Sequence, residues 1–301
     1  MRYVGMDLSQ LRMFKTVAEQ GSIARASEIL HCVPSNITNR IKLLEAEMGV
    51  SLFIRKGRGL IITPSGKILL EYASKILSYC QEARRALEPS SEPAGILRIG
   101  AIESAATGRL PMVLSKFHQN YPAVRVEFST GTWQQLVIDV ADHKLDGAVI
   151  ATKNDHPNIT YVNVHKESLV LIASPYAGKI SSPQDLKGKS IYMWPHGCPY
   201  RQALEHWMNQ HQVTFDIIDI ASYGTILGCV SCGSGVSLVP AGFFEQFKGA
   251  SNISGYTFSE LLPVQNYFIR NSIIESHYAR NAFETLLRAE LNEARHSYHC
   301  I

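Results

Sequence analysis

Apolar residues recur every three or four positions in three separate runs within the first 48 residues. The first run covers residues 8–18, the second 23–30 and the third 37–48, and the period breaks at residues 31–33. This spacing places apolar side chains on one face of an α-helix, so we predict three short helices around a small shared core. The predicted core positions are Leu8, Leu11, Phe14, Val17, Ala18, Ile23, Ala26, Ile29, Leu30, Ile37, Ile41, Leu44 and Met48.

Local signals mark the ends of these helices and a hairpin after them. Ser22 is a suitable N-cap, because its hydroxyl can accept a hydrogen bond from an orphan backbone N–H. Pro34 suits the first position of the third helix, where an N–H would be unpaired. After Gly49, a strand around 52–55, the turn KGRG and a strand over 60–62 predict a β-hairpin. Three helices and a hairpin in this order form a winged helix-turn-helix.

The outer face of the third helix and the hairpin carry candidate DNA contacts. Short hydrogen-bonding side chains mixed with cations suit a helix in a major groove, although an ordinary solvated face is the alternative. At the hairpin tip, glycines allow a tight turn and hold two cations clear of the body, where phosphates could be reached. The predicted DNA-binding residues are Ser22, Pro34, Ser35, Asn36, Thr38, Asn39, Arg40, Lys42, Arg55, Lys56 and Arg58.

A long helix follows the hairpin, beginning at Thr63-Pro64 and ending before Pro89. Its apolar stripe runs from Ile68 to Leu87, roughly six turns, which is too much for so small a head to bury. We therefore expect the helix to pair with its copy in a second chain; packing on the chain's own body is the alternative. Two heads on one dyad would read an inverted repeat. The predicted dimerisation residues are Leu69, Tyr72, Ile76, Cys80 and Ala83.

From residue 96 the pattern alternates between strand and helix, after a short hinge at 90–95. Strands are expected at 96–100, 124–129 and 145–150, with helices at 109–119 and 133–141. A second set has strands at 159–164, 168–174, 190–194, 215–222 and 235–240, with helices at 201–210 and 224–232. A strand at 264–270 and a helix at 275–294 return to the first set. Such alternation predicts an α/β region of two lobes on parallel sheets, with a cleft between them.

Composition and charge agree with a nucleic-acid-binding head on a small-molecule-binding body. Of the 301 residues, 46% are hydrophobic and 18% charged, as in a globular protein. Residues 1–91 hold 13 Lys and Arg against 8 Asp and Glu, whereas residues 92–301 hold 16 against 18. The sequence shows no signal peptide and no membrane-length apolar segment, and its six scattered cysteines suit a reducing interior. We expect a cytoplasmic protein.

The chain resembles the LysR-type transcriptional regulators. The resemblance rests on MDLSQLRMFKTVAEQGSIARASEIL, IKLLEAEMGVSLFIRKGRG and LIITPSGKILL, and later on GCVSCGSGVSLVP. It implies a DNA-binding domain over 6–62, a linker helix and hinge over 63–91, and an effector domain over 92–301 similar to periplasmic binding proteins. The two subdomains would cover about 95–165 plus 268–301, and 166–267. The family's common Ser-Gln-Pro-Ala opening is replaced here by Val33-Pro34-Ser35-Asn36, so its base preference is not transferable.

Polar residues follow several predicted strands of the two lobes, where ligands of open α/β sheets bind. Hydroxyls, glycines and one arginine gather there, so we predict a small polar or anionic effector, with Arg201 as its charge partner and Ser104, Thr130 and Thr132 as donors. Glu103 argues mildly against an anion. The predicted effector-binding residues are Glu103, Ser104, Thr130, Gly131, Thr132, His196, Cys198, Tyr200, Arg201 and Gly224.

The cysteines leave a thiol-based sensor as the alternative, through Cys198 or the pair Cys229 and Cys232. Small buried cysteines are common in cores, so structural roles are favoured. No metal-ligand spacing accompanies Cys229-x-x-Cys232, and we expect no metal, no cofactor and no catalytic residue. The sequence thus predicts a DNA-binding regulator that responds to a small molecule and assembles as a dimer or a dimer of dimers, without membrane contact.

Overall fold

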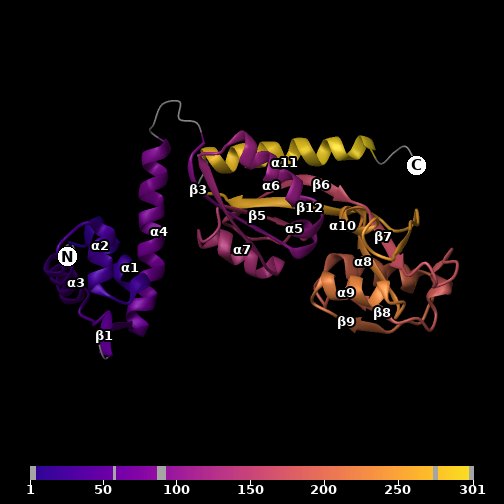
Figure 1. Cartoon of the computed structure of the whole chain (residues 1–301), viewed down its shortest axis with the longest axis horizontal. Helices are drawn as coiled ribbons and strands as arrows, with labels where there is room; N and C mark the ends of the chain where they lie inside the picture. Colours follow the sequence, from indigo (N-terminus) through magenta and orange to yellow (C-terminus); the bar gives the residue numbers. More distant parts are fainter. Residues whose placement is uncertain (1–4, 57–58, 87–92, 274–276, 298–301) are drawn as a thin grey trace. The chain divides into compact units, whose positions relative to one another are not determined.

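The computed structural model describes residues 5–56, 59–86, 93–273 and 277–297, and it divides into two compact units, residues 1–90 and 91–301 (Figure 1). Each unit has its own hydrophobic cores. Arg58 of the predicted wing, Leu87, the hinge residues 90–92 and the C-terminal residues 298–301 lie outside the described residues, as does the side chain of Lys56.

The first unit is the predicted winged helix-turn-helix followed by one long helix. Three helices precede a two-stranded antiparallel hairpin in which Phe53 pairs with Ile62. The described elements are α1 (Leu8–Gln20), α2 (Ile23–Leu30), α3 (Pro34–Met48), β1 (Phe53–Lys56), β2 (Gly59–Ile62) and α4 (Pro64–Ala86). The predicted fold of this head is therefore confirmed.

Side-chain caps set the ends of these helices. Ser22 accepts a hydrogen bond from the Arg25 backbone N–H, and Asp7 caps α1 through the N–H of Gln10. At the corner between α2 and α3, His31 adopts a left-handed conformation with φ of 49°. At the start of α4, a Cβ on Gly66 would clash with the Leu52 carbonyl oxygen, so only glycine fits there.

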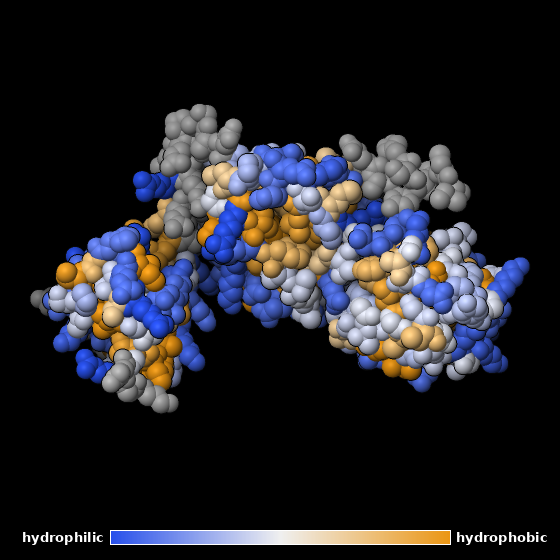
Figure 2. All heavy atoms as spheres, in the orientation of Figure 1, coloured by the Kyte–Doolittle hydropathy of each residue, from blue (hydrophilic) through white to orange (hydrophobic). Residues whose placement is uncertain are grey.

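Most predicted core positions of the head are buried, including Phe14, Ile37 and Leu44. Ala18, Ile23, Leu30 and Met48 are half-buried, and Leu8 and Ile29 are exposed, contrary to the prediction. Apolar side chains thus reach the surface of the head, as the orange patches in Figure 2 show.

Helix α4 carries two apolar faces rather than the single stripe that the sequence predicted. Ala73 belongs to the core of the head, and Leu69, Leu70, Ile76 and Leu77 pack against that core. Leu69 and Ile76 were both expected at a dimer interface, but they also complete the head. This happens because α4 lies along α1, where a stretch of the helix finds partners within its own chain.

A different stripe of α4 stays on the surface. Ile68, Tyr72 and Tyr79 are exposed, and so are Cys80 and Ala83. Ile68, Tyr72, Tyr79 and Ala83 follow one another at spacings of four, seven and four residues, which places them on one side of the helix. They form an apolar strip on the surface of the helix.

The first lobe of the second unit is a five-stranded sheet in the order β4-β3-β5-β12-β6. Helices α6 and α11 cover one face through Phe117 and Phe283, and α7 covers the other through Leu136 and Val140 (Figure 1). Its elements are β3 (Gly95–Ala101), α5 (Glu103–Gly108), α6 (Leu110–Asn120), β4 (Val124–Thr130), α7 (Trp133–Ala141), β5 (Gly147–Ile150), β6 (Ile159–Glu167), β12 (Val264–Asn271) and α11 (Tyr278–Ser297).

The second lobe is a five-stranded sheet in the order β11-β7-β10-β8-β9. Helix α8 packs on one face through Leu204 and Trp207, and α9 and α10 pack on the other through Ile226 and Phe243. Its elements are β7 (Leu169–Ala173), the 3₁₀ turn η1 (Pro183–Leu186), β8 (Ile191–Met193), α8 (Pro199–Gln210), β9 (Ile217–Asp219), α9 (Tyr223–Ser231), β10 (Val236–Pro240), α10 (Ala241–Phe247) and β11 (Ser254–Tyr256).

The predicted α/β class is confirmed, but three details were wrong. Both sheets are mixed, because β12 runs antiparallel to β5 and β6, and β7 runs antiparallel to β10 and β11. Strand β6, which the strand–helix alternation grouped with the second lobe although the subdomain bounds implied by the family resemblance placed residues 159–164 in the first, pairs with β12 in the first. The short helices α5 and α10 were not predicted, since six or seven residues are too few to show a helical period.

The chain crosses between the lobes at two places. It passes from β6 to β7 at Ser168, and it returns at Val264 as β12 begins. A buried ion pair stands beside the first crossing: Glu167 accepts from Arg109 Nε and Nη2 at 3.1 and 3.0 Å, and from the Gly242 N–H at 3.0 Å. The carboxylate therefore ties α10 of the second lobe to the first, close to both crossings.

Candidate functional site

The exposed face of α3 presents most of the residues predicted to contact DNA. Ser35, Asn36, Asn39 and Lys42 are exposed, while Ile37, Ile41 and Leu44 point into the core. Pro34 occupies the first position of the helix, and Thr38 is half-buried with its hydroxyl donating to the Pro34 carbonyl at 2.9 Å. The helix thus separates a packed side from a polar side, as a recognition helix requires.

Arg40 has a structural partner that the sequence did not predict. Its Nη1 lies 2.7 Å from Asp7 Oδ2, so the guanidinium joins α3 to the N-cap of α1. In the wing, Arg55 on β1 is exposed, and Glu45 holds this strand by accepting from the N–H groups of Leu52 and Phe53. The wing is therefore fixed to the C-terminal half of α3.

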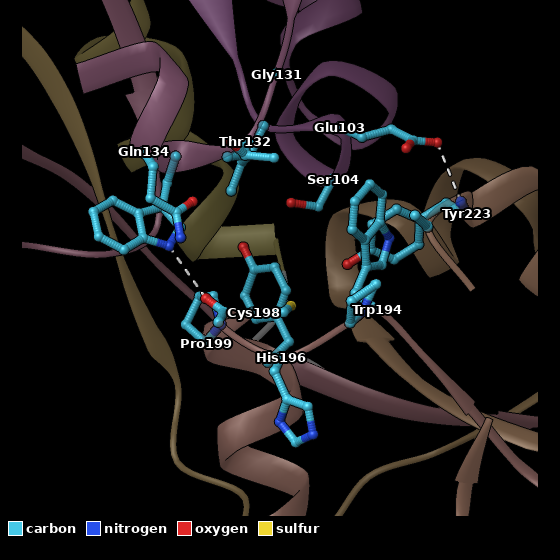
Figure 3. Close-up of a pocket in the computed structure, with 16 residues that line it drawn as sticks. Glu103, Ser104, Gly131, Thr132, Gln134, Trp194, His196, Cys198, Pro199 and Tyr223 are labelled. Carbon is cyan, nitrogen blue, oxygen red and sulfur yellow. Dashed lines mark hydrogen bonds between the residues drawn. The ribbon is translucent and has the colours of Figure 1, made fainter. Parts of the chain in front are cut away.

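A pocket of about 200 Å³ opens in the second unit, between residues of its two lobes. Its walls come from the segments after β3, β4 and β8 and from the start of α9. Seven of the ten predicted effector-binding residues line it: Glu103, Ser104, Gly131, Thr132, His196, Cys198 and Tyr200. Figure 3 shows Ser104 and Thr132 on one side of the space and Cys198 and His196 on the other, with the His196 ring directed away from Ser104.

Three predicted residues do not line the pocket. Thr130 is exposed at the end of β4, and Gly224 is exposed on α9. Arg201 is only 5% exposed and turns into the second lobe. Each of these is a sequence neighbour of a residue that lines the pocket, Gly131, Tyr200 or Tyr223, but does not line it itself.

The Arg201 guanidinium donates its hydrogen bonds to groups within the protein. This corrects its predicted role as the charge partner of a ligand. Its Nε donates to Glu205 at 2.7 Å, and its Nη1 donates to Asp219 and to the Trp194 carbonyl. Burial lowers the pKa of the guanidinium, but the bonds to the two carboxylates outweigh this effect and raise the pKa. The side chain is a permanently charged brace between α8 and the ends of β8 and β9.

Two hydrogen bonds cross the pocket from one lobe to the other. Glu103 Oε1 accepts from the Tyr223 backbone N–H at 3.1 Å, and Trp133 Nε1 donates to the Gly197 carbonyl at 3.3 Å. Figure 3 draws both contacts as dashed lines on opposite sides of the space. A ligand between them would touch both lobes at once.

The tyrosines of the pocket stay protonated. Burial and the charge of Glu167 raise the pKa of Tyr200, and hydrogen bonds with Ser104 and Asn266 oppose this only in part. Burial likewise raises the pKa of Tyr223 well above its ordinary value. Both hydroxyls are therefore neutral hydrogen-bonding groups.

The sequence reasoning missed the aromatic walls. Trp133, Gln134, Trp194 and Tyr223 all line the pocket. Trp133 and Gln134 directly follow the predicted Thr132, Trp194 ends a predicted strand and Tyr223 precedes the predicted Gly224. Including every residue within two positions of a predicted site residue would have found them.

The surroundings of Cys198 do not activate its thiol. Burial raises the pKa of Cys198, although the N–H groups of Arg201 and Tyr200 partly oppose this effect, so the thiol stays protonated at neutral pH. Cys229 is half-buried on α9, and Cys232 is exposed at its C-cap; both are free. Within the described ranges, no cluster of His, Cys, Asp and Glu could hold a metal ion, and no helix is long and apolar enough to cross a membrane.

Family comparisons agree with this arrangement of a winged helix-turn-helix head and a second unit that contains the pocket. Residues 8–67 match the model described as "Bacterial regulatory helix-turn-helix protein, lysR family", and residues 90–291 match "LysR substrate binding domain". The chain belongs to the LysR family. It is therefore a LysR-type transcriptional regulator with a DNA-binding and an effector-binding domain, as the sequence resemblance predicted.

Relatives extend this similarity over nearly the whole chain. This LysR regulator is 35% identical to the HTH-type transcriptional regulator GltR of Bacillus subtilis over 285 residues, covering 94% of this chain and 96% of GltR. It is 33% identical to the uncharacterized regulator YusT of the same organism, covering 97% and 99%. These relatives are named as regulators rather than as enzymes.

Solved structures share the fold at lower identity. A full-length OxyR variant from Pseudomonas aeruginosa aligns with a TM-score of 0.72 at 21% identity, over 94% of this chain and 98% of that chain. Full-length CbnR complexed with its target DNA aligns with a TM-score of 0.64 at 22% identity, over 95% and 100%.

Proposed function

We propose that a small effector binds in the pocket of this LysR regulator and changes transcription by altering how the two lobes close. The observation that carries this proposal is the pair of hydrogen bonds across the pocket, from Glu103 to Tyr223 and from Trp133 to Gly197. A ligand that replaces or reinforces these bonds has different affinities for closed and open lobes. Such a difference is what a ligand needs to shift a conformational equilibrium.

The DNA-binding role is assigned to the exposed face of α3 and to the wing. Ser35, Asn36, Asn39 and Lys42 form the polar side of α3, and Arg55 stands exposed on β1. Helix α3 then reads bases in the major groove, while wing cations contact phosphates. Arg40 is better assigned to bracing the head through Asp7.

The exposed strip of α4 supports assembly of two copies. Ile68, Tyr72, Tyr79 and Ala83 present apolar surface on one side of this helix. Pairing of two such strips about a dyad buries them and places two heads on an inverted-repeat operator. A dimer of such dimers is the larger assembly that the same arrangement permits.

The effector role is tested by removing one indole N–H at the pocket and one elsewhere. Trp133→Phe deletes the bond from α7 to Gly197, between the lobes. Trp207→Phe is the matched control, because it deletes an indole bond to Glu260 within the second lobe. Both variants are assayed for reporter expression and for operator affinity of the full-length protein.

We expect Trp133→Phe to change reporter expression while operator affinity stays near wild type. Trp133→Phe does not weaken the second lobe. Trp207→Phe lowers the stability of the second lobe and leaves regulation intact. If the two variants give the same expression, lobe closure at the pocket does not control transcription and the proposal fails.

A further inference from the structure

We propose that the effector carries a positively charged nitrogen, as a small organic amine or quaternary ammonium ion does. This inference rests on the effector role proposed above and adds the charge of the ligand. Glu103 is the one carboxylate among the described residues that line the pocket, and no lysine or arginine lines it. The fixed charge of the site is therefore negative, opposite to what an anionic metabolite needs.

The nearest guanidinium does not change this sign. Arg201 is neutralised by Glu205 and Asp219 on the far side of the pocket wall. Arg201 also approaches His196, with Nη2 3.2 Å from Nε2. A guanidinium can only donate, so His196 Nε2 is the acceptor in this contact. In Figure 3 this ring points away from Ser104 and Glu103.

Three of the helices that begin at the pocket, α7, α8 and α9, already have acceptors at their N-termini, whereas α5 begins after Ile102 without a side-chain cap. Glu103 itself accepts from the Tyr223 N–H at the start of α9, and Thr132 Oγ1 accepts from the Gln135 N–H of α7 at 3.3 Å. Helix α8 begins with Pro199, which has no N–H, and the Cys198 sulfur accepts from the next two backbone groups. An anion would have to displace these bonds before it could use the dipoles of α7, α8 and α9.

Aromatic rings form the rest of the walls. Trp133, Trp194, Tyr200 and Tyr223 line the space, and the rings of Trp194 and Tyr223 lie 5.6 Å apart at an interplanar angle of 40°. The electron-rich faces of such rings attract ammonium groups, and the attraction grows where water is excluded. The pocket volume of about 200 Å³ leaves room for a small amine.

Matched compounds test the charge. Full-length protein is titrated calorimetrically with benzylamine, benzyl alcohol and benzoate, and with butyltrimethylammonium, butanol and butyrate. Each set keeps the same phenyl ring or straight alkyl chain and changes the polar group at its end. We expect the two cations to bind and the two anions not to bind.

The second part of the experiment repeats the titration of the cations with the variant Glu103→Gln. The amide keeps an oxygen that can accept from the Tyr223 N–H, so the contact between the lobes survives while the charge is lost. We expect cation binding to weaken by about tenfold to a hundredfold, as the loss of a charge-assisted contact predicts. Glu245→Gln, on the surface beside Lys248 of α10, is the control and leaves binding unchanged.

Three results would overturn the assignment. They are binding of the carboxylates in preference to the cations, no binding of either cation to the wild type, and undiminished cation binding by Glu103→Gln. The first would leave the effector role in place and reverse only the charge, and the Trp133→Phe comparison tests that role separately.

Discussion

Arg201→Ala distinguishes a structural arginine from one that binds a ligand. In the wild type the guanidinium donates to Glu205, Asp219 and the Trp194 carbonyl oxygen. Removing it leaves a carbonyl and a half-buried carboxylate without their donor. Breaking a fully buried pair costs about 3–5 kcal/mol. Because the Asp219 side chain is 48% exposed and regains water, we expect a smaller loss of about 2–4 kcal/mol.

Tryptophan fluorescence measures this loss of stability in the second unit, which contains Arg201. All three tryptophans of the chain lie in the second unit, so urea unfolding followed by their emission measures that unit alone. Arg125→Ala is the matched control. The Arg125 side chain is 79% exposed and pairs only loosely with Glu127 at 3.9 Å, so its loss should change the free energy of unfolding by less than about 0.5 kcal/mol.

The alternative outcome is equally definite. An Arg201→Ala protein that unfolds at the wild-type urea concentration, yet no longer changes reporter expression when effector is supplied, would refute the structural assignment. Arg201 would then be the charge partner that the sequence suggested. The proposed cationic effector would lose its support at the same time, since a free guanidinium beside the pocket favours an anion.

Three further predictions concern other parts of the chain. Val33→Ser should stabilise α3 by about 0.5–2 kcal/mol, because Val33 caps this helix without a side-chain bond; amide hydrogen exchange in α3 measures this. Tyr72→Asp should dissociate the dimer in sedimentation while the head stays folded, since Tyr72 is 59% exposed; an intact dimer would place the interface elsewhere. Burial raises the pKa of Asp146, but His277 and the Arg98 N–H outweigh it and hold this pKa below its ordinary value. The advantage of wild type over Asp146→Asn in urea unfolding should therefore be present above pH ~4 and disappear as the pH falls below it; a constant difference across this range would contradict the assignment.

The sequence by itself determined the architecture and the position of the pocket. Helical and strand periods, the caps at Ser22 and Pro34, and glycine-rich turns are local signals, so they survive without knowledge of long-range contacts. The rule that ligands bind at strand ends located Glu103, Ser104, Thr132 and the loop after β8, because this rule depends only on chain direction.

The tertiary structure decided the partners of charged and apolar groups. Arg201 follows a predicted strand as a ligand-binding arginine would, but Glu205 and Asp219 are brought to it only when α8 and β9 pack together. The sequence pattern grouped Leu69 and Ile76 with Tyr72 in one helical stripe, yet Leu69 and Ile76 contact the core of the head because α4 lies along α1, and Tyr72 stays exposed. A period along one helix shows which side chains share a face, whereas the neighbour of that face is set by segments distant in sequence.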